Sequence, residues 1–588
     1  MSNSIKMAFA ALSCFALSAC FGGPLQDPTA SVVDAESADI ILKNARIFTS
    51  GAEKPWAEAV AIKDGRFVFV GDDDAVADFT GEETVVSDLE GQFVMPGMID
   101  SHAHPAMMGL INLHGFLARV SPDDFPATVK AAVENIPGEG WVRLCCWWNE
   151  NYIADGKPGP NKVDLDVAVP DRPLWIISRG WHSTWMNSRA LEILGVTKET
   201  KDPAPGVADF VRDENGELTG WVKEGAAWQY SSDQFAVDPE KLEGHVDAAL
   251  AGLSEAGVTT VFDAGNIDYE DEVYGYISEL DAAGELPVRY EGTYMVFVPE
   301  RRYDAIAEMK RLQETYGGER LNFRKVKLFM DGITPELSSG MIEPFEGYPD
   351  YVPDTLLSVA ELRDWLLELH DAKFDLHIHA IGDLSVRRAL DAVEEAQEIV
   401  GPDFYPRVTL AHLETVDEAD MPRFQELGVT ATFTPQWHGR LTPDFSHGLV
   451  GDERAGHEFP ANAILSEGGN VSFSSDDFGL DALSPFLGIQ IGHNRRDPEE
   501  WLEGIDVAPD AFRPPESEKI ALEDMLKGYT IRGAYSLRMG DELGSIEVGK
   551  IADLLVLSDD PFKVDRRTIH KIEPSVIMME GEVTRGTL

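Results

Sequence analysis

The sequence predicts an α/β protein in which a (β/α)8 TIM barrel is joined to a composite β-sandwich built from both ends of the chain. In the middle of the chain, eight short apolar runs follow one another, most of them preceded by a helix-patterned segment. Such strand–helix alternation is typical of a parallel barrel. Near both ends, short alternating strands carry Asp-Gly and Glu-Gly turn signals instead.

The 588-residue chain is long enough for a barrel and an accessory domain, and 44% of its residues are apolar. It carries 103 acidic against 49 basic residues, for a formal net charge of -54. So acidic a chain repels nucleic acid and anionic lipid headgroups, and we expect neither as a partner. The acids are spread along the whole chain, which favours a solvated acidic surface over a site that recruits cations.

Residues 1–19 are predicted to be a signal peptide, because Lys6 precedes an apolar run too short to span a bilayer and a small-residue cleavage site. The tetrapeptide "LSAC" at 17–20 resembles a bacterial lipobox, which implies cleavage before Cys20 and attachment of lipid to its sulfur. Residues 20–38 would then form a lipidated tether. We expect an exported protein, anchored on the periplasmic side or at the outer membrane, that touches the membrane only through its lipid. An ordinary secretory signal cut nearby is the alternative.

Two neighbouring cysteines, Cys145 and Cys146, remain once Cys14 has left with the signal and Cys20 is lipidated. We expect these two not to pair, because disulfide geometry is demanding for adjacent residues. The sequence contains no CxxC or Cys/His spacing of the kind that binds zinc.

The β-sandwich is predicted over residues 39–93 and 535–588, and the barrel over residues 94–534. The barrel strands are expected in eight apolar runs, at 93–104, 258–265, 287–296, 325–332, 375–382, 407–414, 429–436 and 470–477. The stretch from about 106 to 244 does not fit this rhythm. It holds most of the tryptophans, and we predict that it is a large insertion after the first barrel strand.

Side chains suited to metal binding and acid–base chemistry stand where these strands end, which is where barrel enzymes place their active sites. They are His102, His104, Lys327, His377, His379, His412, Asp476 and Asp477. Each one alone is more often a hydrogen-bonded core residue or a helix cap, but together they have the composition of a hydrolytic metal site. Strand alternation does not separate Lys327 from Lys325 or His379 from His377, so both choices stay open at this point.

Several long motifs resemble the amidohydrolase superfamily. They are "MPGMIDSHAHP" (95–105), "HAIGD" (379–383), "AHLE" (411–414), "SSDD" (474–477) and the near-terminal "GSIEVGKIADLLVLSDDP". Three more, "PLWIISRGWHSTWMNSRALEILG" (173–195), "GELTGWVKEGA" (216–226) and "KLFMDG" (327–332), resemble amidohydrolase family 3, which includes N-substituted formamide deformylase-like enzymes. The resemblance extends from Asp39 to the C-terminus.

The resemblance implies a set of roles. His102 and His104 would bind the more buried metal, usually zinc, and His379 and His412 would hold the second metal. Lys327 would be carboxylated and bridge the two metals. Asp476 would bind metal and act as general base and then general acid, and His182 would contact the substrate or polarise its carbonyl. The expected cofactor is therefore one or two divalent ions such as Zn²⁺. If Lys327 is not carboxylated, the site would be mononuclear.

The sequence thus predicts a metal-dependent amidohydrolase that cleaves a non-peptide C–N bond, of N-substituted amide or formamide type, in a small-molecule substrate. Trp148, Trp181, Trp437 and His438 are expected to line an apolar substrate pocket, although tryptophans that staple the insertion to the barrel explain the pattern equally well. Hydrolysis of an ester, a lactone or an N-acyl amino acid at the same site is the alternative. A non-catalytic binding or regulatory lipoprotein is the alternative of another class, and a homodimer stays open.

Overall fold

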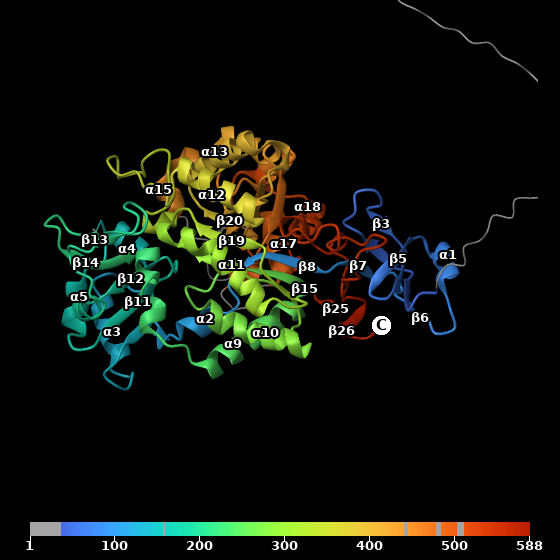
Figure 1. The fold of residues 1–588 in the computed structure, drawn as a ribbon, viewed down its shortest axis with the longest axis horizontal. Helices are drawn as coiled ribbons and strands as arrows, with labels where there is room; N and C mark the ends of the chain where they lie inside the picture. The colour runs from blue at the N-terminus through green and yellow to red at the C-terminus, as the bar shows by residue number, and fades with distance from the viewer. Residues whose placement is uncertain (1–36, 157–158, 440–444, 478–483, 503–507, 509–510) are drawn as a thin grey trace, which may run out of the picture.

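The computed structural model describes residues 37–588, apart from 157–158, 440–444, 478–483, 503–507 and 509–510 (Figure 1). The predicted signal peptide, the predicted lipidation site Cys20 and the tether up to residue 36 lie outside the described residues. In the described part of the chain, no helix has the length and apolar character needed to cross a membrane. Figure 1 shows three regions side by side: the insertion on the left, the barrel strands and their helices in the centre, and the sheet domain on the right.

Eight strands lie within the eight apolar runs that the sequence singled out. They are β8 (Met98–Ala103), β15 (Val258–Asp263), β16 (Arg289–Glu291), β19 (Lys325–Phe329), β20 (Asp375–Ala380), β21 (Val408–His412), β22 (Thr430–Phe433) and β23 (Asn470–Phe473). Together with the short strands β17 (Met295–Val296) and β18 (Leu321–Asn322), they form two parallel sheets, in the orders β18-β16-β15-β8 and β17-β19-β20-β21-β22-β23. Nearly all their residues are buried, which is why these strands read as continuous apolar runs.

Backbone hydrogen bonds join the last strand to the first just where each ends. The Asp476 N–H donates to the His102 carbonyl over 2.9 Å, and the His104 N–H donates to the Asp477 carbonyl over 2.7 Å. The segments after β23 and at the end of β8 therefore lie side by side. This junction brings together side chains that are more than 370 positions apart in the sequence.

Helices alternate with these strands along the chain. The longer ones are α9 (Pro239–Glu255), α10 (Glu270–Ala283), α11 (Arg302–Tyr316), α12 (Val359–Ala372) and α13 (Asp383–Val400), and shorter ones are α14 (Arg423–Glu426), α16 (Ala461–Ser466), α17 (Pro485–Asn494), α18 (Leu522–Gly528) and α19 (Ile531–Ser536). Helix α12 shows why such segments are helical. Ser358 and Glu361 form a reciprocal capping box at its start, and Leu362, Trp365 and Leu369 form its buried face.

The sheet domain is composite, as predicted. One sheet, in the order β5-β4-β1-β6, contains β1 (Ile40–Lys43), β4 (Ala59–Lys63), β5 (Arg66–Gly71) and β6 (Val85–Asp88). The other, in the order β26-β25-β24-β7-β2-β3, combines β2 (Arg46–Phe48), β3 (Trp56–Ala57) and β7 (Phe93–Pro96) with the C-terminal strands β24 (Leu554–Leu557), β25 (Pro574–Met579) and β26 (Glu582–Arg585). A shared core that includes Ile62, Val94 and Leu554 packs between them.

Both domain boundaries differ from the predicted ones. Strand β7 belongs to the sheet domain, so the change to the barrel falls at Gly97 instead of residue 94. On the C-terminal side, Leu537 and Leu543 pack against Ile99 and Phe262 of the barrel strands. The segment just after 535 therefore belongs with the barrel, because its apolar residues pack against the barrel strands.

The insertion contains a six-stranded sheet that the sequence analysis did not predict. Its order is β13-β14-β12-β11-β10-β9, from β9 (Gly115–Phe116), β10 (Val142–Trp147), β11 (Leu174–Ser178), β12 (Ser183–Met186), β13 (Phe210–Arg212) and β14 (Leu218–Lys223). Helices α3 (Phe125–Val133) and α5 (Lys162–Ala168) supply apolar residues to a core on one face of this sheet. Trp147, Trp185 and Trp221 belong to that core, so much of the tryptophan content of the insertion is structural.

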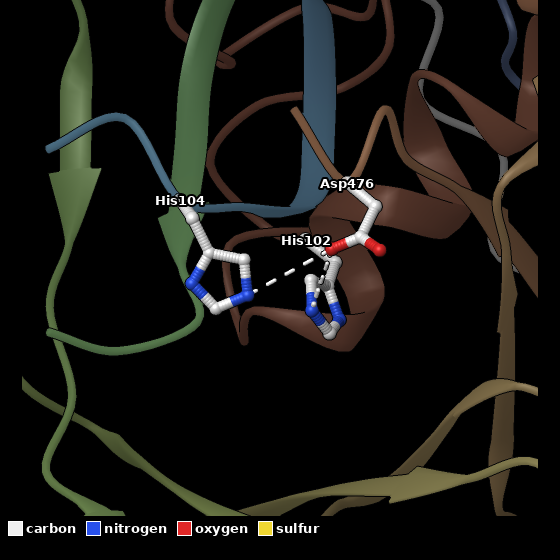
Figure 2. Close-up of side chains that lie close together, drawn as sticks. All are labelled: His102, His104 and Asp476. Atoms are coloured by element: carbon white, nitrogen blue, oxygen red, sulfur yellow. Dashed lines mark ion pairs between the residues drawn. The ribbon is translucent and has the colours of Figure 1, made fainter. Parts of the chain in front are cut away.

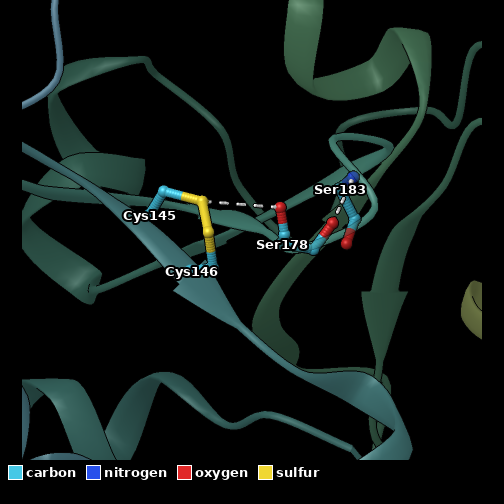
Figure 3. Close-up of a disulfide and its surroundings, with 4 residues drawn as sticks. All are labelled: Cys145, Cys146, Ser178 and Ser183. Atoms are coloured by element: carbon cyan, nitrogen blue, oxygen red, sulfur yellow. Dashed lines mark hydrogen bonds between the residues drawn. A yellow bond between two sulfur atoms is a disulfide. The ribbon is translucent and has the colours of Figure 1, made fainter. Parts of the chain in front are cut away.

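Cys145 and Cys146 form a disulfide on β10, so the expectation that these neighbours do not pair is wrong (Figure 3). The pairing of β10 with β11 shifts register between Cys145 and Trp147, which marks a bulge. A bulge redirects side chains that would otherwise alternate across a strand. Both cysteines are buried, and Cys145 Sγ lies 4.0 Å from the Ser178 carbonyl oxygen on β11.

Candidate metal centre and its cavity

His102, His104 and Asp476 form a compact cluster where β8 ends and the segment after β23 passes it (Figure 2). Asp476 Oδ1 lies 3.3 Å from His102 Nε2 and 3.7 Å from His104 Nε2. All three side chains are at least nine-tenths buried. Asp476 has a φ of 50°, an unusual value for a residue with a side chain, and this local conformation is part of what aims its carboxylate at the two imidazoles.

The other ring nitrogens of the two histidines are held by the fold. His104 Nδ1 donates to the Gly265 carbonyl over 3.1 Å, so Nε2 is the ring nitrogen that faces Asp476. His102 Nδ1 lies 2.8 Å from His377 Nε2. Partners of this kind fix the ring orientation and tautomer of a metal-binding histidine. The donor set therefore fits a divalent cation at the Nε2 side of both rings.

The structure separates Lys327 from Lys325. The Lys327 amine lies 3.1 Å from His102 Nε2 and lines the cavity, whereas Lys325 bonds to Thr409 and to the Ser536 carbonyl, away from the cluster. Burial lowers the pKa of Lys327, although Asp476 attracts its charged form. An uncharged amine in this position is the form that carboxylation requires.

His379 and His412 lie next to this cluster, with their ring centroids 4.6 Å apart. Both line the cavity, whereas His377 is directed to His102 and does not. His379 Nδ1 lies 3.2 Å from Asp331 Oδ1, and His412 stacks on Trp437 with centroids 5.3 Å apart. The geometry therefore favours His379 over His377 as the residue that faces the site.

Burial determines the protonation of these imidazoles. It lowers the pKa values of His102, His377, His379 and His412 well below their usual range, and that of His104 to about 3. Neighbouring cations and imidazoles lower them further. Neutral imidazole is the form that binds a metal, so no proton has to be removed from these rings when a cation binds.

His182, from the insertion, reaches the same site. Its ring centroid lies 5.0 Å from that of His379, and its Nδ1 lies 2.6 Å from Glu224 Oε2. Burial acts to lower the pKa of His182, but the nearby carboxylates of Glu224, Glu336 and Asp476 outweigh it and raise that pKa. With Nδ1–H donated to Glu224, a protonated ring presents Nε2–H as a second donor.

Glu224 and Asp331 are functional candidates that the sequence analysis missed, although both stand in quoted motifs. Glu224 holds His182. Asp331 lies beside His379 and accepts hydrogen bonds from the backbone N–H groups of Gly340, Ile381 and Gly382. The signal was present as a carboxylate in a long motif, but only the folded structure pairs each carboxylate with its histidine.

The cluster forms part of the wall of a cavity of about 690 Å³, large enough for a small organic substrate. Trp148, Trp181 and Trp437 line it, as predicted. His438 is not among the lining residues: it is fully buried and stacks on Phe459, so the prediction that it lines the pocket is wrong. Pro435–His438 form one 3₁₀ turn, in which consecutive side chains point about 120° apart.

The sheet of the insertion forms another part of this wall. Val142 and Leu144 of β10 pack into the core of the insertion, and Arg143 between them lines the cavity. On β11, Trp175 and Ile177 likewise face the cavity. Strand alternation therefore directs one face of this sheet into the core of the insertion and the other face towards the cavity.

Comparisons with known proteins show which family and which relatives the sequence of this chain resembles. A family model described as "Amidohydrolase family" matches residues 85–585. The exoenzymes regulatory protein AepA of Pectobacterium carotovorum subsp. carotovorum is 29% identical over 441 residues, which cover 73% of this chain and 92% of the relative. The N-substituted formamide deformylase of Arthrobacter pascens is 26% identical over 549 residues, which cover 89% of this chain and 94% of the relative.

A solved structure has a similar fold. The uncharacterized metal-dependent hydrolase from Pyrococcus furiosus aligns with a TM-score of 0.61 at 24% sequence identity. The alignment covers 89% of this chain and all of that one. The likeness supports a TIM-barrel-type fold with a sheet domain.

Proposed function

This chain belongs to the amidohydrolase family, and from that premise we propose that it hydrolyses a non-peptide C–N bond in an N-substituted amide or formamide. One observation carries the proposal. Two neutral imidazoles and a carboxylate converge at the cavity wall, with a buried lysine and two further histidines beside them. This is the donor set of a hydrolytic metal site.

We propose that His102, His104 and Asp476 hold one divalent cation, and that carboxylated Lys327, His379 and His412 hold a second. Imidazole and carboxylate donors suit zinc. When bound, such a cation lowers the pKa of a water molecule and polarises a carbonyl oxygen. Carboxylation joins the uncharged Lys327 amine to CO₂ with loss of one proton, and the lowered pKa of this lysine supports that step.

Asp476 is the proposed proton carrier. Burial raises the pKa of its carboxyl, although Lys327 and His182 act to lower it. A carboxylate with a raised pKa takes a proton from the attacking water more readily than an ordinary aspartate does, and it then donates that proton to the leaving nitrogen.

His182 is the proposed partner of the substrate carbonyl. Glu224 holds the ring by Nδ1 and favours its protonated form, so Nε2–H is available to the cavity. A donor placed where negative charge develops on the carbonyl oxygen stabilises the transition state more than the ground state.

A substrate panel tests this proposal. Protein reconstituted with Zn²⁺ is assayed against matched N-substituted formamides, amides, esters, lactones and N-acyl amino acids, with metal-stripped protein and His102→Ala as controls. We expect hydrolysis of C–N substrates that depends on metal and is lost in His102→Ala. Less than one equivalent of tightly held metal, together with unchanged activity in His102→Ala, would overturn the proposal.

The name of the relative from Pectobacterium keeps a regulatory protein as the competing hypothesis. That hypothesis predicts that ligand residues have been lost. Here His102, His104, Lys327, His379 and Asp476 are all present and lie together in the structure. The retained donors support the hydrolase, and the panel above separates the two.

A further inference from the structure

Among the residues that the structure describes, Arg143 is a buried cation without a counter-ion. Arg143 is only 9% exposed, and its side chain extends from strand β10 to line the cavity. Its Nε has no hydrogen-bond partner, and within the described residues no carboxylate or carbonyl pairs with its guanidinium. A buried charge that lacks a partner is costly in a folded protein, so its retention needs an explanation.

The surroundings of Arg143 do not supply one. Its guanidinium carbon lies 4.6 Å from the centre of the Phe235 ring. This cation–π contact stabilises the charge, but the ring has no oxygen or nitrogen atom to accept hydrogen bonds from the guanidinium N–H groups. Burial lowers the pKa of Arg143, and burial also raises the pKa of the neighbouring Tyr269 hydroxyl, which is therefore uncharged at neutral pH. That hydroxyl already donates to the Phe235 carbonyl.

One acidic side chain of the cavity wall is attracted by other cations. Glu150 lines the same cavity, and the cations that attract it are Arg119 and Arg179. Both of these arginines lie beside the Trp148 ring, at 4.5 and 5.8 Å from its centre. Three arginines therefore line one cavity in a chain whose acids outnumber its bases two to one, and Arg143 is the buried one.

We propose that the Arg143 guanidinium binds a carboxylate on the substrate, so that the enzyme acts on carboxylate-bearing amides. A guanidinium pairs with a carboxylate through two parallel N–H···O bonds. Arg143 is the one buried guanidinium of the three and lies beside Phe235, Trp175 and Tyr269, and one guanidinium balances one negative charge, which favours a carboxylate over a phosphate monoester. The metal cluster and Arg143 line the same cavity, so one substrate can contact both.

The prediction that the enzyme hydrolyses carboxylate-bearing amides rests on the proposed function. The prediction that Arg143 binds a carboxylate does not depend on it. The binding test uses metal-free protein and calorimetry. The probes are N-acetylglycine, N-acetyl-β-alanine, 4-acetamidobutyrate and 6-acetamidohexanoate, each paired with its uncharged primary amide. We expect at least one carboxylate of the series to bind more tightly than its amide partner. Arg143→Met should lose about 30-fold or more of that affinity, because it removes one partner of a buried charge pair.

Two further variants make the binding result specific. Arg143→Lys keeps the charge but loses the two-pronged geometry, so it should retain part of the preference for the carboxylate. Arg189→Met removes an exposed arginine of the same insertion, one that pairs with Glu192 away from the cavity, and should bind as the wild type does. Equal affinity of wild type and Arg143→Met for every carboxylate in the series would overturn the inference.

A stability measurement excludes a merely structural role. If Arg143 is kept for a ligand, replacing it by methionine removes an unpaired buried charge, and the Tm of the ligand-free protein should stay the same or rise. A fall in Tm, with the carboxylate and its amide partner weakened equally, would assign Arg143 to the fold instead.

The catalytic readout separates the two proposals. With zinc-loaded wild type, we expect kcat/KM to be higher for the carboxylate than for its amide partner, and Arg143→Met should remove that difference. If the wild type hydrolyses neither compound, the proposed reaction fails while the binding result on Arg143 still holds. If it hydrolyses both equally, and Arg143→Met changes neither rate, the reaction stands and the inference on Arg143 fails.

Discussion

Lys327 is the residue on which the metal content depends. Its amine lies 3.1 Å from His102 Nε2, and burial in the barrel interior lowers its pKa. If its carbamate bridges two cations, Lys327→Met should bind about one equivalent of zinc where the wild type binds two. The kcat/KM should fall by about 100-fold or more, a loss at the upper end of what supporting residues of metal sites cause. Metal analysis of gel-filtered protein beside activity measures both.

Lys310→Met provides the matched control, because Lys310 is exposed on helix α11, far from the cavity wall. It should keep both metal equivalents and full activity. One equivalent in wild type and Lys327→Met alike would show that the centre is mononuclear and that Lys327 acts as an ordinary cavity residue.

Local sequence specified some of these residues and not others. His102 lies on β8 and His104 comes directly after the strand ends, two positions on, so the alternation of an extended chain predicted that both face the same side. The same rule could not separate Lys327 from Lys325, since both point into the barrel and only their height along it differs. Asp331, Glu224 and Arg143 could not be found by spacing, because each acquires its role from a partner or a cavity formed by distant segments.

At the scale of elements, the core shared by the two ends of the chain predicts how a substitution in β24 changes the free energy of unfolding. Leu554 is fully buried at the start of β24, which pairs with β7 from the N-terminal part and with β25 from the C-terminal part. Leu554→Ala should lower the free energy of unfolding of the sheet domain by about 2–5 kcal/mol, because it leaves a cavity in the core shared by the two sheets. Urea unfolding followed by circular dichroism measures the shift.

The control for this substitution is Val583→Ala on the edge strand β26, where the side chain is 38% exposed. It should change stability by well under half as much, since less apolar surface leaves the interior. If Leu554→Ala behaves like this control, the two ends of the chain do not share a core in solution.

Elements were predicted where their pattern was long and regular. The barrel strands are continuous apolar runs between helix-patterned segments, so all eight could be placed from sequence. The strands of the insertion are short, and loops and helices of irregular length separate them, so its sheet was missed. The apolar runs of β10 and β11 were visible, but no repeated spacing connected them. The register shift beside Cys145 and Cys146 likewise depends on pairing with a neighbouring strand.

At the scale of the whole molecule, the repulsion that comes with a net charge of -54 lowers the free energy of unfolding. Carboxylates spread over one surface repel one another, and folding brings them closer than they are in the unfolded chain. Salt screens this repulsion over a Debye length that shrinks from about 30 Å at 0.01 M to about 10 Å at 0.1 M. We therefore expect the Tm to rise with ionic strength.

The surface ion pairs oppose this trend, because salt screens them too. Pairs such as Lys198–Glu217 are more than half exposed, and exposed pairs of this kind contribute at most about 1 kcal/mol each. With acids exceeding bases by 54, repulsion involves many more partners than these pairs do, so it should dominate. For a chain of 588 residues, about 1 kcal/mol of relieved repulsion would raise the Tm by roughly 1 °C. Calorimetric scans between 0.01 and 0.5 M NaCl, repeated in KCl to exclude a sodium-specific effect, measure the slope. A Tm that falls with both salts would mean that the ion-pair network outweighs the net charge.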